Sequence, residues 1–233
     1  MIDILLAGVG GQGTVLAAKV LAQAAQSKGW QVRTAETIGM AQRGGNVTSH
    51  VRMGSNGEAV CSPLITPGTA DMVIALEPGE AARALPYLAP GGVLVTATTA
   101  IQPVTAALAS QPYRAGDVVA ALANSLQAEA SHEQAAETIV APNTVTADQD
   151  ASADGVEGYP VPLFIPVDDE ALVREAGAGS RKSLNMMLLA VAVAQGRVPL
   201  TVDELKDAVR ACVKPQFVAM NLAAIDTAVA NFG

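Results

Sequence analysis

The residues best suited to chemistry in this sequence form a glycine-rich run near the N-terminus, Gly8-Val9-Gly10-Gly11-Gln12-Gly13. The absence of a Cβ on glycine lets the oxygen atoms of a ligand reach main-chain N–H groups. If a helix follows, its first turn adds unpaired N–H donors and the positive end of its dipole. We therefore expect this loop, lined by Gly8, Gly10, Gly11, Gln12 and Gly13, to bind a phosphate, pyrophosphate or carboxylate group.

The same motif leaves two other hypotheses open. The glycines could serve only the packing of a strand against a helix, in a scaffold protein whose loop binds nothing. The spacing also occurs in dinucleotide-binding proteins, where an acidic residue about 20 positions later binds the ribose. Glu36 occupies that place, so an NAD-type dehydrogenase is a competing interpretation. Against it, the segment after Glu36 is rich in glycine and does not resemble an ordinary helix.

A second run with chemical potential follows, Gly39-Met40-Ala41-Gln42-Arg43-Gly44-Gly45-Asn46-Val47-Thr48-Ser49-His50-Val51-Arg52. Arg43 places a cation beside flexible backbone, and its guanidinium presents a fork of donors suited to phosphate or carboxylate. We expect this loop to approach the same anion as the first one. A solvated arginine in a surface loop is the simpler alternative.

The elements that must position these loops can be read from hydrophobic periodicity. A short apolar strand is expected at Ile2–Ala7, a helix at Thr14–Lys28 that ends at Gly29, and a second strand at Trp30–Glu36. The glycine run thus lies after a strand and before a helix, in a βαβ unit. This context favours ligand binding over packing alone.

The rest of the chain alternates strands and helices, and thus predicts a three-layer α/β/α fold with a largely parallel sheet and C-terminal helices packed on it. The expected elements are strands Val47–Met53, Glu58–Ser62 (a hairpin partner), Asp71–Leu76, Val93–Ala97 (after a Pro90-Gly91-Gly92 turn) and Val161–Val167, and helices Pro78–Leu88, Asp117–Ala130, Asp168–Ala176, Lys182–Gln195, Asp203–Val213 and Phe217–Val229. Thr201 and Glu204 form a capping box before one of these helices. Asn143–Gly158 is polar and acidic, and we expect a mobile excursion there.

Composition excludes several functional classes. The chain has 233 residues, half of them hydrophobic, and a net charge of −8, so it lacks the basic surface of a nucleic-acid-binding protein. No apolar stretch approaches the roughly 20 residues of a membrane span, and the N-terminus lacks the features of a signal peptide. Cys61 and Cys212 are too few for a conventional iron–sulfur cluster, and we expect each to be a buried or partly buried small hydrophobic residue.

Three acid–base candidates have structural explanations. His50 lies within a predicted strand, where a hydrogen-bonded structural histidine is favoured over a proton carrier. Glu77 and Glu80 flank Pro78-Gly79 at the carboxyl end of a strand, where ligands gather in open α/β sheets. Stabilisation of a helix N-terminus is the simpler role for these two carboxylates.

Several segments together resemble a known family. They are GVGGQG, GMAQRGGNVTSHVR about thirty residues later, Ser62-Pro63-Leu64-Ile65, Ala70–Glu77 with Glu80-Ala81, Leu88–Gly92, Ser183–Leu189, Lys214-Pro215, Asn221 and Ala223-Ala224. The pattern resembles the gamma-type domain of 2-oxoacid:ferredoxin oxidoreductases, and within them the beta subunit of indolepyruvate ferredoxin oxidoreductase. The likeness covers about 1–105 and 161–233. It implies one gamma-type domain over 1–233, with a polar insertion or excursion within 110–160.

The resemblance also implies a function. Such enzymes oxidatively decarboxylate a 2-oxoacid, here an arylpyruvate such as indolepyruvate, to an acyl-CoA and pass two electrons to ferredoxin. Thiamine diphosphate and [4Fe–4S] clusters would lie on a partner subunit of a cytoplasmic heteromer of anaerobic metabolism. This chain would hold no tightly bound cofactor and would contribute to binding coenzyme A as cosubstrate. Matching positions place Gln42, Arg43, Gly44, Gly45 and Asn46 in the second loop of that site.

Overall fold

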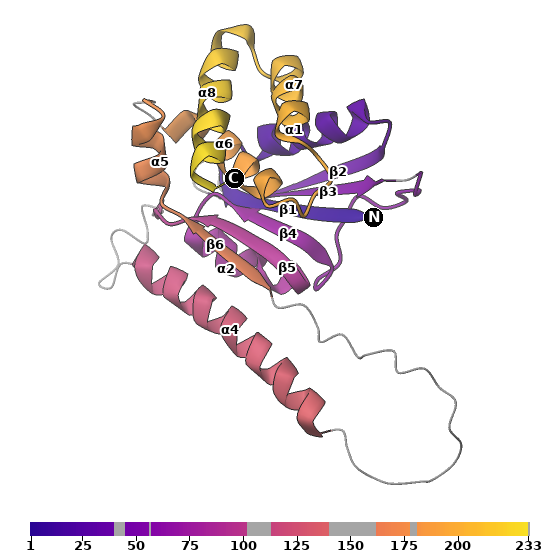
Figure 1. The fold of residues 1–233 in the computed structure, drawn as a ribbon, viewed down its shortest axis with the longest axis vertical. Coiled ribbons are helices and arrows are strands. Elements are labelled where there is room, and N and C mark those ends of the chain that lie inside the picture. Colours follow the sequence, from indigo (N-terminus) through magenta and orange to yellow (C-terminus); the bar gives the residue numbers. More distant parts are fainter. Residues whose placement is uncertain (40–44, 56, 102–112, 140–161, 178–180, 233) are drawn as a thin grey trace.

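The computed structural model describes residues 1–39, 45–55, 57–101, 113–139, 162–177 and 181–232, with the stretch 129–139 as backbone only. In chain order, the elements are β1 (Ile2–Val9), α1 (Thr14–Ser27), β2 (Gln31–Ile38), β3 (Asn46–Gly54), β4 (Ala70–Ala75), α2 (Pro78–Ala84), the 3-10 turn η1 (Leu85–Tyr87), β5 (Leu88–Ala97), α4 (Ala115–Ile139), β6 (Leu163–Val167), α5 (Asp169–Glu175), the 3-10 turn η2 (Arg181–Ser183), α6 (Leu184–Ala194), α7 (Val202–Cys212) and α8 (Pro215–Phe232). Figure 1 shows their arrangement.

The six strands form one mixed sheet in the order β2-β3-β1-β4-β5-β6. Strands β1, β4, β5 and β6 run parallel, whereas β3 is antiparallel to both β1 and β2. The carboxyl ends of the parallel strands therefore lie at the same edge as the start of β3. This arrangement brings the two predicted loops to one edge of the sheet.

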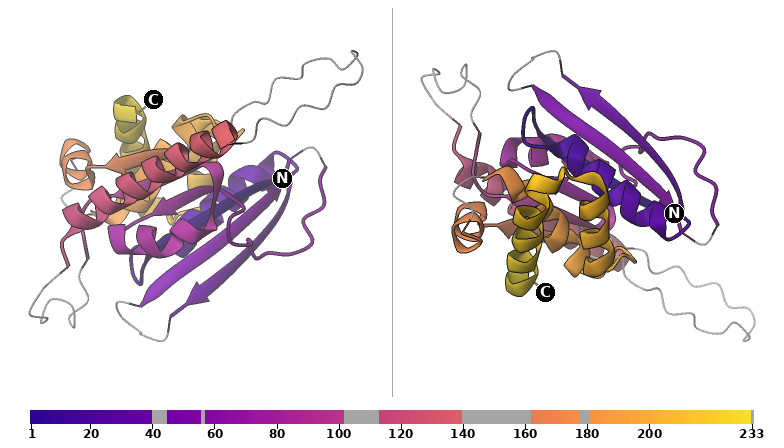
Figure 2. Two further views of the ribbon diagram at one scale, coloured as in Figure 1. Left: turned by 90° about the horizontal axis from the view of Figure 1, so that it is seen from below. Right: turned by 90° about the horizontal axis from the view of Figure 1, so that it is seen from above.

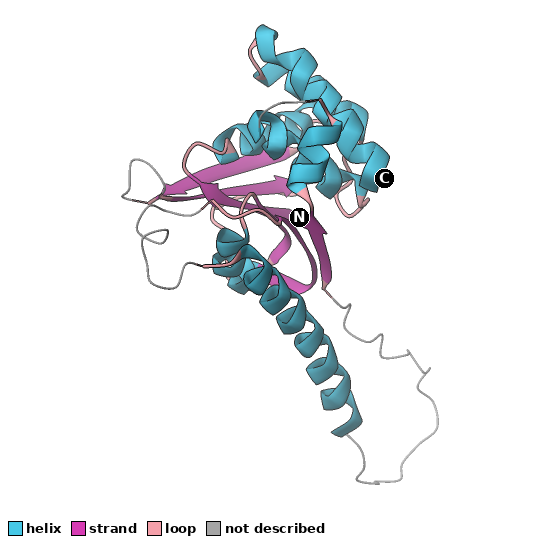
Figure 3. Cartoon of the chain, turned by 90° about the vertical axis from the view of Figure 1, so that its left-hand side faces the viewer, coloured by secondary structure: helices cyan, strands magenta, loops and turns pink. Residues whose placement is uncertain are grey.

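Helices cover both faces of the sheet, as predicted (Figures 1 and 3). Side chains alternate along β1, so Ile4 and Leu6 enter one core with α1, α6, α7 and α8, whereas Leu5 and Ala7 enter a second core with α2 and α4. Every residue from Leu184 to Val193 in α6 is buried. A helix that is apolar on all sides belongs in the centre of a fold, and α6 lies between the sheet and α8.

The N-terminal βαβ unit differs from the prediction in one respect. Strand β3 lies between β1 and β2 and pairs with each of them along its length, so β1 and β2 are not neighbours. Strand β2 forms the outer edge of the sheet (Figure 2). Helix α1 contacts β2 and β3, but most residues of β2 are exposed. Periodicity finds each strand, but it does not specify which strands pair.

Several local predictions were wrong. Pro90-Gly91-Gly92 lies inside β5, where Ala70 pairs with Leu88 and Met72 with Val93, so the extra residues form a bulge rather than a turn before the strand. Residues 58–62 form no strand. Cys212 is partly buried, as expected, but Cys61 is exposed, so the expectation of a buried or partly buried side chain is wrong at Cys61.

Other local predictions were confirmed. Both hydrogen bonds of the capping box at the start of α7 are present, between Thr201 and Glu204. Helix α4 starts near the predicted position but is longer, and Leu122 and Leu126 on it are buried against the sheet. The predicted excursion at Asn143–Gly158 lies outside the described residues.

Candidate functional site

The glycine-rich loop connects the end of β1 to the start of α1. Gly11 and Gly13 have φ angles of 98° and 84°, in the region that favours glycine. A hydrogen bond of 3.1 Å from the Gln12 N–H to the Val9 carbonyl oxygen closes a tight turn over Val9–Gln12. Gly11 is exposed, and a Cβ built on it would meet nothing within 4 Å. The backbone at Gly11 is therefore open to a ligand.

The side chain of Gln12 turns inward. Its Oε1 accepts a hydrogen bond of 2.6 Å from the Val9 N–H, and its Nε2 donates one of 2.8 Å to the carbonyl oxygen of Leu76, just after β4. Helices α1 and α2 follow β1 and β4 and cover opposite faces of the sheet, so the space between these strand ends is the point where ligands of open α/β folds gather. Gln12 fills part of this space and fixes the base of the loop.

Asn185 at the start of α6 holds the other end of the loop, a role that the sequence did not predict. Its Nδ2 donates a hydrogen bond of 3.0 Å to the Gly13 carbonyl oxygen, and the side chain is buried. A Cβ on Gly13 would lie 2.5 Å from that nitrogen, so residue 13 is glycine for its φ angle and for this close approach. One signal in the sequence could have revealed Asn185: it is a polar residue near the start of a helix whose other residues are all apolar.

The second loop meets the first one. The Gly10 N–H donates a hydrogen bond of 2.9 Å to the Gly45 carbonyl oxygen, and the Gly39 N–H donates one of 2.8 Å to the carbonyl oxygen of Asn46, which closes the base of the second loop. Gln42, Arg43 and Gly44 lie outside the described residues, so the position of the expected cation stays a prediction. Of the residues predicted to bind the anion from the second loop, the structure places Gly45 and Asn46 beside the first loop.

The remaining donors of the first loop form the candidate anion site. Among its amides, those of Val9, Gly10 and Gln12 already donate within the chain. In the described part of the chain, the N–H groups of Gly11 and Gly13 have no acceptor, and the first turn of α1 adds further free donors. This turn carries no acidic residue that would repel an anion. The geometry can therefore bind a phosphate or carboxylate through backbone N–H groups and the helix dipole.

Glu36, the residue on which the dinucleotide hypothesis depends, is not placed as that hypothesis requires. A ribose-binding acid lies at the end of the strand next to β1, but here β3 occupies that position. Neighbouring strands are about 4.8 Å apart, which moves the strand of Glu36 to roughly 10 Å from β1. Glu36 instead lines a shallow groove between β2 and α1, together with Val15 and Lys19.

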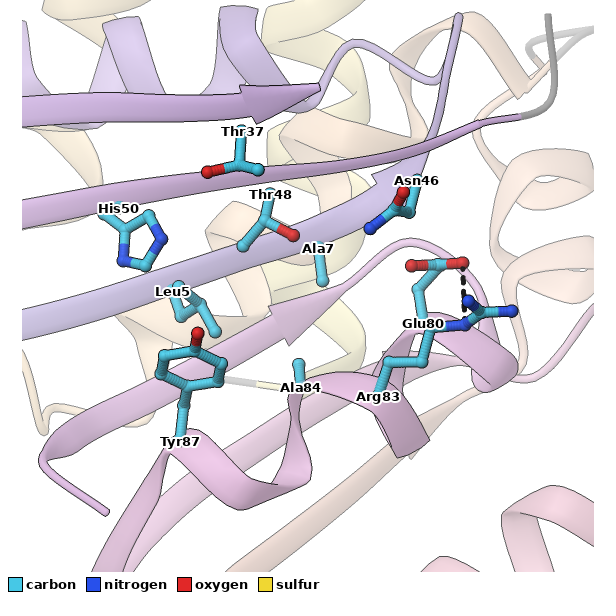
Figure 4. Close-up of a pocket in the computed structure, with 10 residues that line it drawn as sticks. All are labelled: Leu5, Ala7, Thr37, Asn46, Thr48, His50, Glu80, Arg83, Ala84 and Tyr87. Carbon is cyan, nitrogen blue, oxygen red and sulfur yellow. Dashed lines mark ion pairs between the residues drawn. The ribbon is translucent and has the colours of Figure 1, made fainter. Parts of the chain in front are cut away.

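A cavity of about 210 Å³ lies on the opposite face of the sheet, beneath the start of β3 (Figure 4). It is lined by Leu5, Ala7, Thr37, Asn46, Thr48, His50, Glu80, Arg83, Ala84 and Tyr87. Asn46 adjoins Gly45, so this cavity lies next to the second loop. The sequence predicts structural roles for two of these residues, His50 and Glu80, and gives no sign that they line the same cavity.

Each of the acid–base candidates has a structural contact. The Nδ1 atom of His50 accepts a hydrogen bond of 3.2 Å from the Ile65 N–H, and burial lowers the pKa of this histidine. Glu77 caps α2, because its Oε2 accepts a hydrogen bond of 3.0 Å from the Glu80 N–H. The Tyr113 hydroxyl donates to the other oxygen of Glu77, and burial together with this contact raises the pKa of the tyrosine.

Within the described residues, no group of three or more His, Cys, Asp and Glu side chains is arranged to hold a metal ion. None of the described helices combines the length and apolar character that a membrane crossing demands.

Comparison with known families and sequences gives a consistent result. Residues 3–231 match the family model described as pyruvate ferredoxin/flavodoxin oxidoreductase. The chain is 32% identical over 226 residues to indolepyruvate oxidoreductase subunit IorB of Archaeoglobus fulgidus, covering 96% of this chain and 92% of that protein. It is 29% identical to the subunit of the same name from Pyrococcus horikoshii, covering 97% and 94%.

Solved structures show a similar fold. A keto/oxoacid ferredoxin oxidoreductase gamma subunit from Geobacter sulfurreducens superposes with a TM-score of 0.61 at 20% identity, covering 99% of this chain and 97% of that one. A 2-oxoglutarate:ferredoxin oxidoreductase from Magnetococcus marinus, with 2-oxoglutarate, coenzyme A and succinyl-CoA bound, gives the same TM-score at 18% identity, covering 98% of this chain and 30% of that one.

Proposed function

This chain belongs to the pyruvate ferredoxin/flavodoxin oxidoreductase family, and from this membership we propose that it is the subunit of a cytoplasmic arylpyruvate oxidoreductase that binds coenzyme A. The overall reaction converts a 2-oxoacid and coenzyme A to an acyl-CoA and CO2, and passes two electrons to ferredoxin. Indolepyruvate is the proposed substrate because the sequence relatives are named indolepyruvate oxidoreductase subunits, and the similarity covers almost their full length.

The division of labour follows from the side chains of this subunit. Its two cysteines cannot supply the four thiolates that a cluster commonly needs. Thiamine diphosphate and [4Fe–4S] clusters on the partner subunit would supply decarboxylation and electron transfer. This chain would hold and orient the anionic cosubstrate. The observation that supports this role best is at the N-terminus of α1, beside the second loop, where the N–H groups of Gly11 and Gly13 have no acceptor among the described residues.

The proposed contacts are specific. The N–H groups of Gly11, Gly13 and the first turn of α1 would bind phosphate oxygens of coenzyme A. Gln12 would keep the base of the loop in place, and Arg43, with its neighbours Gln42 and Gly44, would approach from the second loop. Gly8 gives the loop its compact base, because a Cβ there would lie 2.7 Å from the Thr14 hydroxyl oxygen and 2.9 Å from Oε1 of Gln12.

The first test is reconstitution. We expect the purified chain to be colourless and inactive alone, and to restore coenzyme A-dependent oxidation of indolepyruvate when mixed with the thiamine-binding subunit. Full activity of that subunit without this chain would contradict the proposal.

The second test addresses the loop, with Gly11→Asp compared against Gly11→Asn in the reconstituted enzyme. Both variants introduce a side chain of similar size at the same φ angle, so only charge differs. A carboxylate within about 5 Å of a bound phosphate costs on the order of 1–3 kcal/mol. We expect Gly11→Asp to raise KM for coenzyme A about tenfold relative to Gly11→Asn. Equal KM values would show that no anion binds at this loop.

A further inference from the structure

Strand β2 forms one outer edge of the sheet and is open to pairing with a further strand (Figure 2). It is eight residues long, contains no proline or glycine, and pairs with β3 without a bulge. The opposite edge strand, β6, has only five residues, and one of them is Pro166. Short length, proline and bulges are usual means by which an edge strand avoids association. Because β2 has none of the three, it is the edge at which this sheet can be extended.

The hydrogen bonds of β2 show which of its main-chain groups face outward. Just beyond the strand, the Gly39 N–H donates to the Asn46 carbonyl oxygen, so these two residues form a hydrogen-bonded pair. Hydrogen-bonded pairs alternate along an antiparallel ladder, and the odd-numbered residues of β2 therefore direct their N–H and C=O groups to β3. The even-numbered residues direct theirs to the free edge; they are Val32, Thr34, Glu36 and Ile38. Among the described residues, these outward main-chain groups have no hydrogen-bond partner.

A second copy of β2 matches these groups when the two strands run antiparallel about a two-fold axis at Ala35. The axis is perpendicular to the sheet, so the sheet continues from one copy to the other and each face keeps its own side chains. Val32 then lies opposite Ile38 of the second copy, and Thr34 lies opposite Glu36. Because β2 has four outward-facing residues, each copy donates four main-chain hydrogen bonds to the other and accepts four.

The side chains favour this register over its neighbours. Ile38 is 68% exposed, the largest value among the exposed large apolar side chains of the described residues, and it meets Val32, which packs against the core. With the axis at Thr34, Ile38 would have no opposite residue in β2, and Val32 would face a carboxylate. With the axis at Glu36, the two Glu36 side chains would oppose each other, which is destabilising. In the register centred on Ala35, no two like charges of β2 lie opposite each other.

We propose that two copies of this chain associate through their β2 strands and form one continuous sheet. The interface is isologous, since the same residues of both copies take part, and it closes the edge that each copy leaves open. It is separate from the glycine-rich loop and does not depend on coenzyme A binding there. An enzyme assembled through this interface contains the subunit in pairs.

Disulfide formation in the full chain tests the register. In the proposed pairing, the Cα atoms of the two Ala35 residues form a non-hydrogen-bonded pair about 4.5 Å apart, within the range that a disulfide spans. Those of the two Thr37 residues are offset along the strand by four positions, or roughly 13 Å. Ala35→Cys is therefore compared with Thr37→Cys, a control on the same strand and face. Both variants also carry Cys61→Ser, because Cys61 is exposed.

Under mild oxidation, we expect Ala35→Cys to form a disulfide-linked dimer at least about tenfold faster than Thr37→Cys at equal concentration. The linked species is measured by non-reducing electrophoresis, and the linked peptide is identified by mass spectrometry. Equal rates, or faster linkage of Thr37→Cys, would overturn the proposed register.

Sedimentation velocity tests the association itself. Thr34→Pro removes an outward N–H and leaves the hydrogen bonds to β3 intact, because an edge strand tolerates proline where its nitrogen faces solvent. Thr34→Ala keeps the N–H and is the matched control. We expect the wild-type chain and Thr34→Ala to form dimers as the concentration rises to about 0.5 mM, and Thr34→Pro to stay monomeric with an unchanged circular dichroism spectrum. A monomeric wild-type chain, or a Thr34→Pro variant that dimerises equally well, would show that β2 does not pair with itself.

Discussion

At the scale of single residues, the conformation of the glycine-rich loop is the part of this protein that the sequence predicts best. The left-handed φ angles of Gly11 and Gly13 follow from the same property of glycine that marks the motif in the sequence. The partners of the loop could not be predicted. Gln12 bonds to Leu76, and Asn185 to Gly13, across separations of 64 and 172 residues that periodicity does not address.

The buried histidine leads to a prediction about pH. Burial lowers the pKa of His50 from its ordinary value of 6.5. As the pH falls below 6.5, the unfolded chain takes up a proton at this position before the folded chain does, so folding loses stability. Each unit by which the pKa is lowered corresponds to about 1.4 kcal/mol.

The comparison variant is His50→Asn, whose Oδ1 can replace Nδ1 as acceptor for the Ile65 N–H. We expect the stability advantage of the wild-type chain over this variant to shrink between pH 7 and pH 5.5, measured by urea denaturation at each pH. An advantage that stays constant or grows as the pH falls would show that the folded state does not disfavour the charged ring.

At the scale of elements, hydrophobic periodicity and capping signals located nearly every described helix and strand. The capping box predicted the start of α7, and Gly29 predicted the end of α1. Strand pairing was beyond these signals, because β3 satisfies the same alternation whether it lies at the edge of the sheet or between β1 and β2. The bulge in β5 was missed for a related reason: Pro-Gly-Gly is typical of turns, and only the neighbouring strand β4 keeps it within the sheet.

The junction between the glycine-rich loop and α6 can be tested by mutation. Gly13→Ala combines an unfavourable φ angle with a Cβ placed 2.5 Å from Asn185, and we expect it to lower the free energy of unfolding by about 3 kcal/mol. Gly29→Ala is the control, because Gly29 has a φ of 78° but open space around its Cα. Its expected cost is about 1 kcal/mol.

Urea denaturation of both variants separates the cost of the unfavourable φ angle, which both share, from the cost of the steric overlap with Asn185, which only Gly13→Ala has. If the two glycine substitutions cost the same, the contact with Asn185 is not tight. The double variant Gly13→Ala with Asn185→Ala completes the analysis, since removal of the asparagine side chain should make the two costs less than additive.

At the scale of the whole molecule, one buried ion pair connects the sheet edge to the C-terminal helices. The Asp169 side chain is fully buried, and its Oδ1 accepts hydrogen bonds of 3.1 and 2.9 Å from the N–H groups of Thr98 and Thr99. Its Oδ2 lies 2.6 Å from the guanidinium of Arg181, just before α6. The residues after β5, helix α5 and the start of α6 therefore meet at one carboxylate.

Removal of this charge should destabilise the fold as a unit. We expect Asp169→Asn to lower the free energy of unfolding by about 3 kcal/mol, because it leaves the buried part of Arg181 without its counter-charge. Asp207→Asn makes the same chemical change in an exposed ion pair with Arg210 and should cost less than about 0.5 kcal/mol. Thermal and urea denaturation provide the measurement, and similar losses for both variants would mean that burial adds nothing to the Asp169 pair.

The contact between Gly13 and Asn185 also has an evolutionary consequence. A larger residue at position 13 is compatible with this fold only if position 185 becomes smaller at the same time, so the two sites should be inherited as a pair and mutate together across related lineages. Chimeras that join the N-terminal half of one relative to the C-terminal half of another should fail most often where this pair is mismatched.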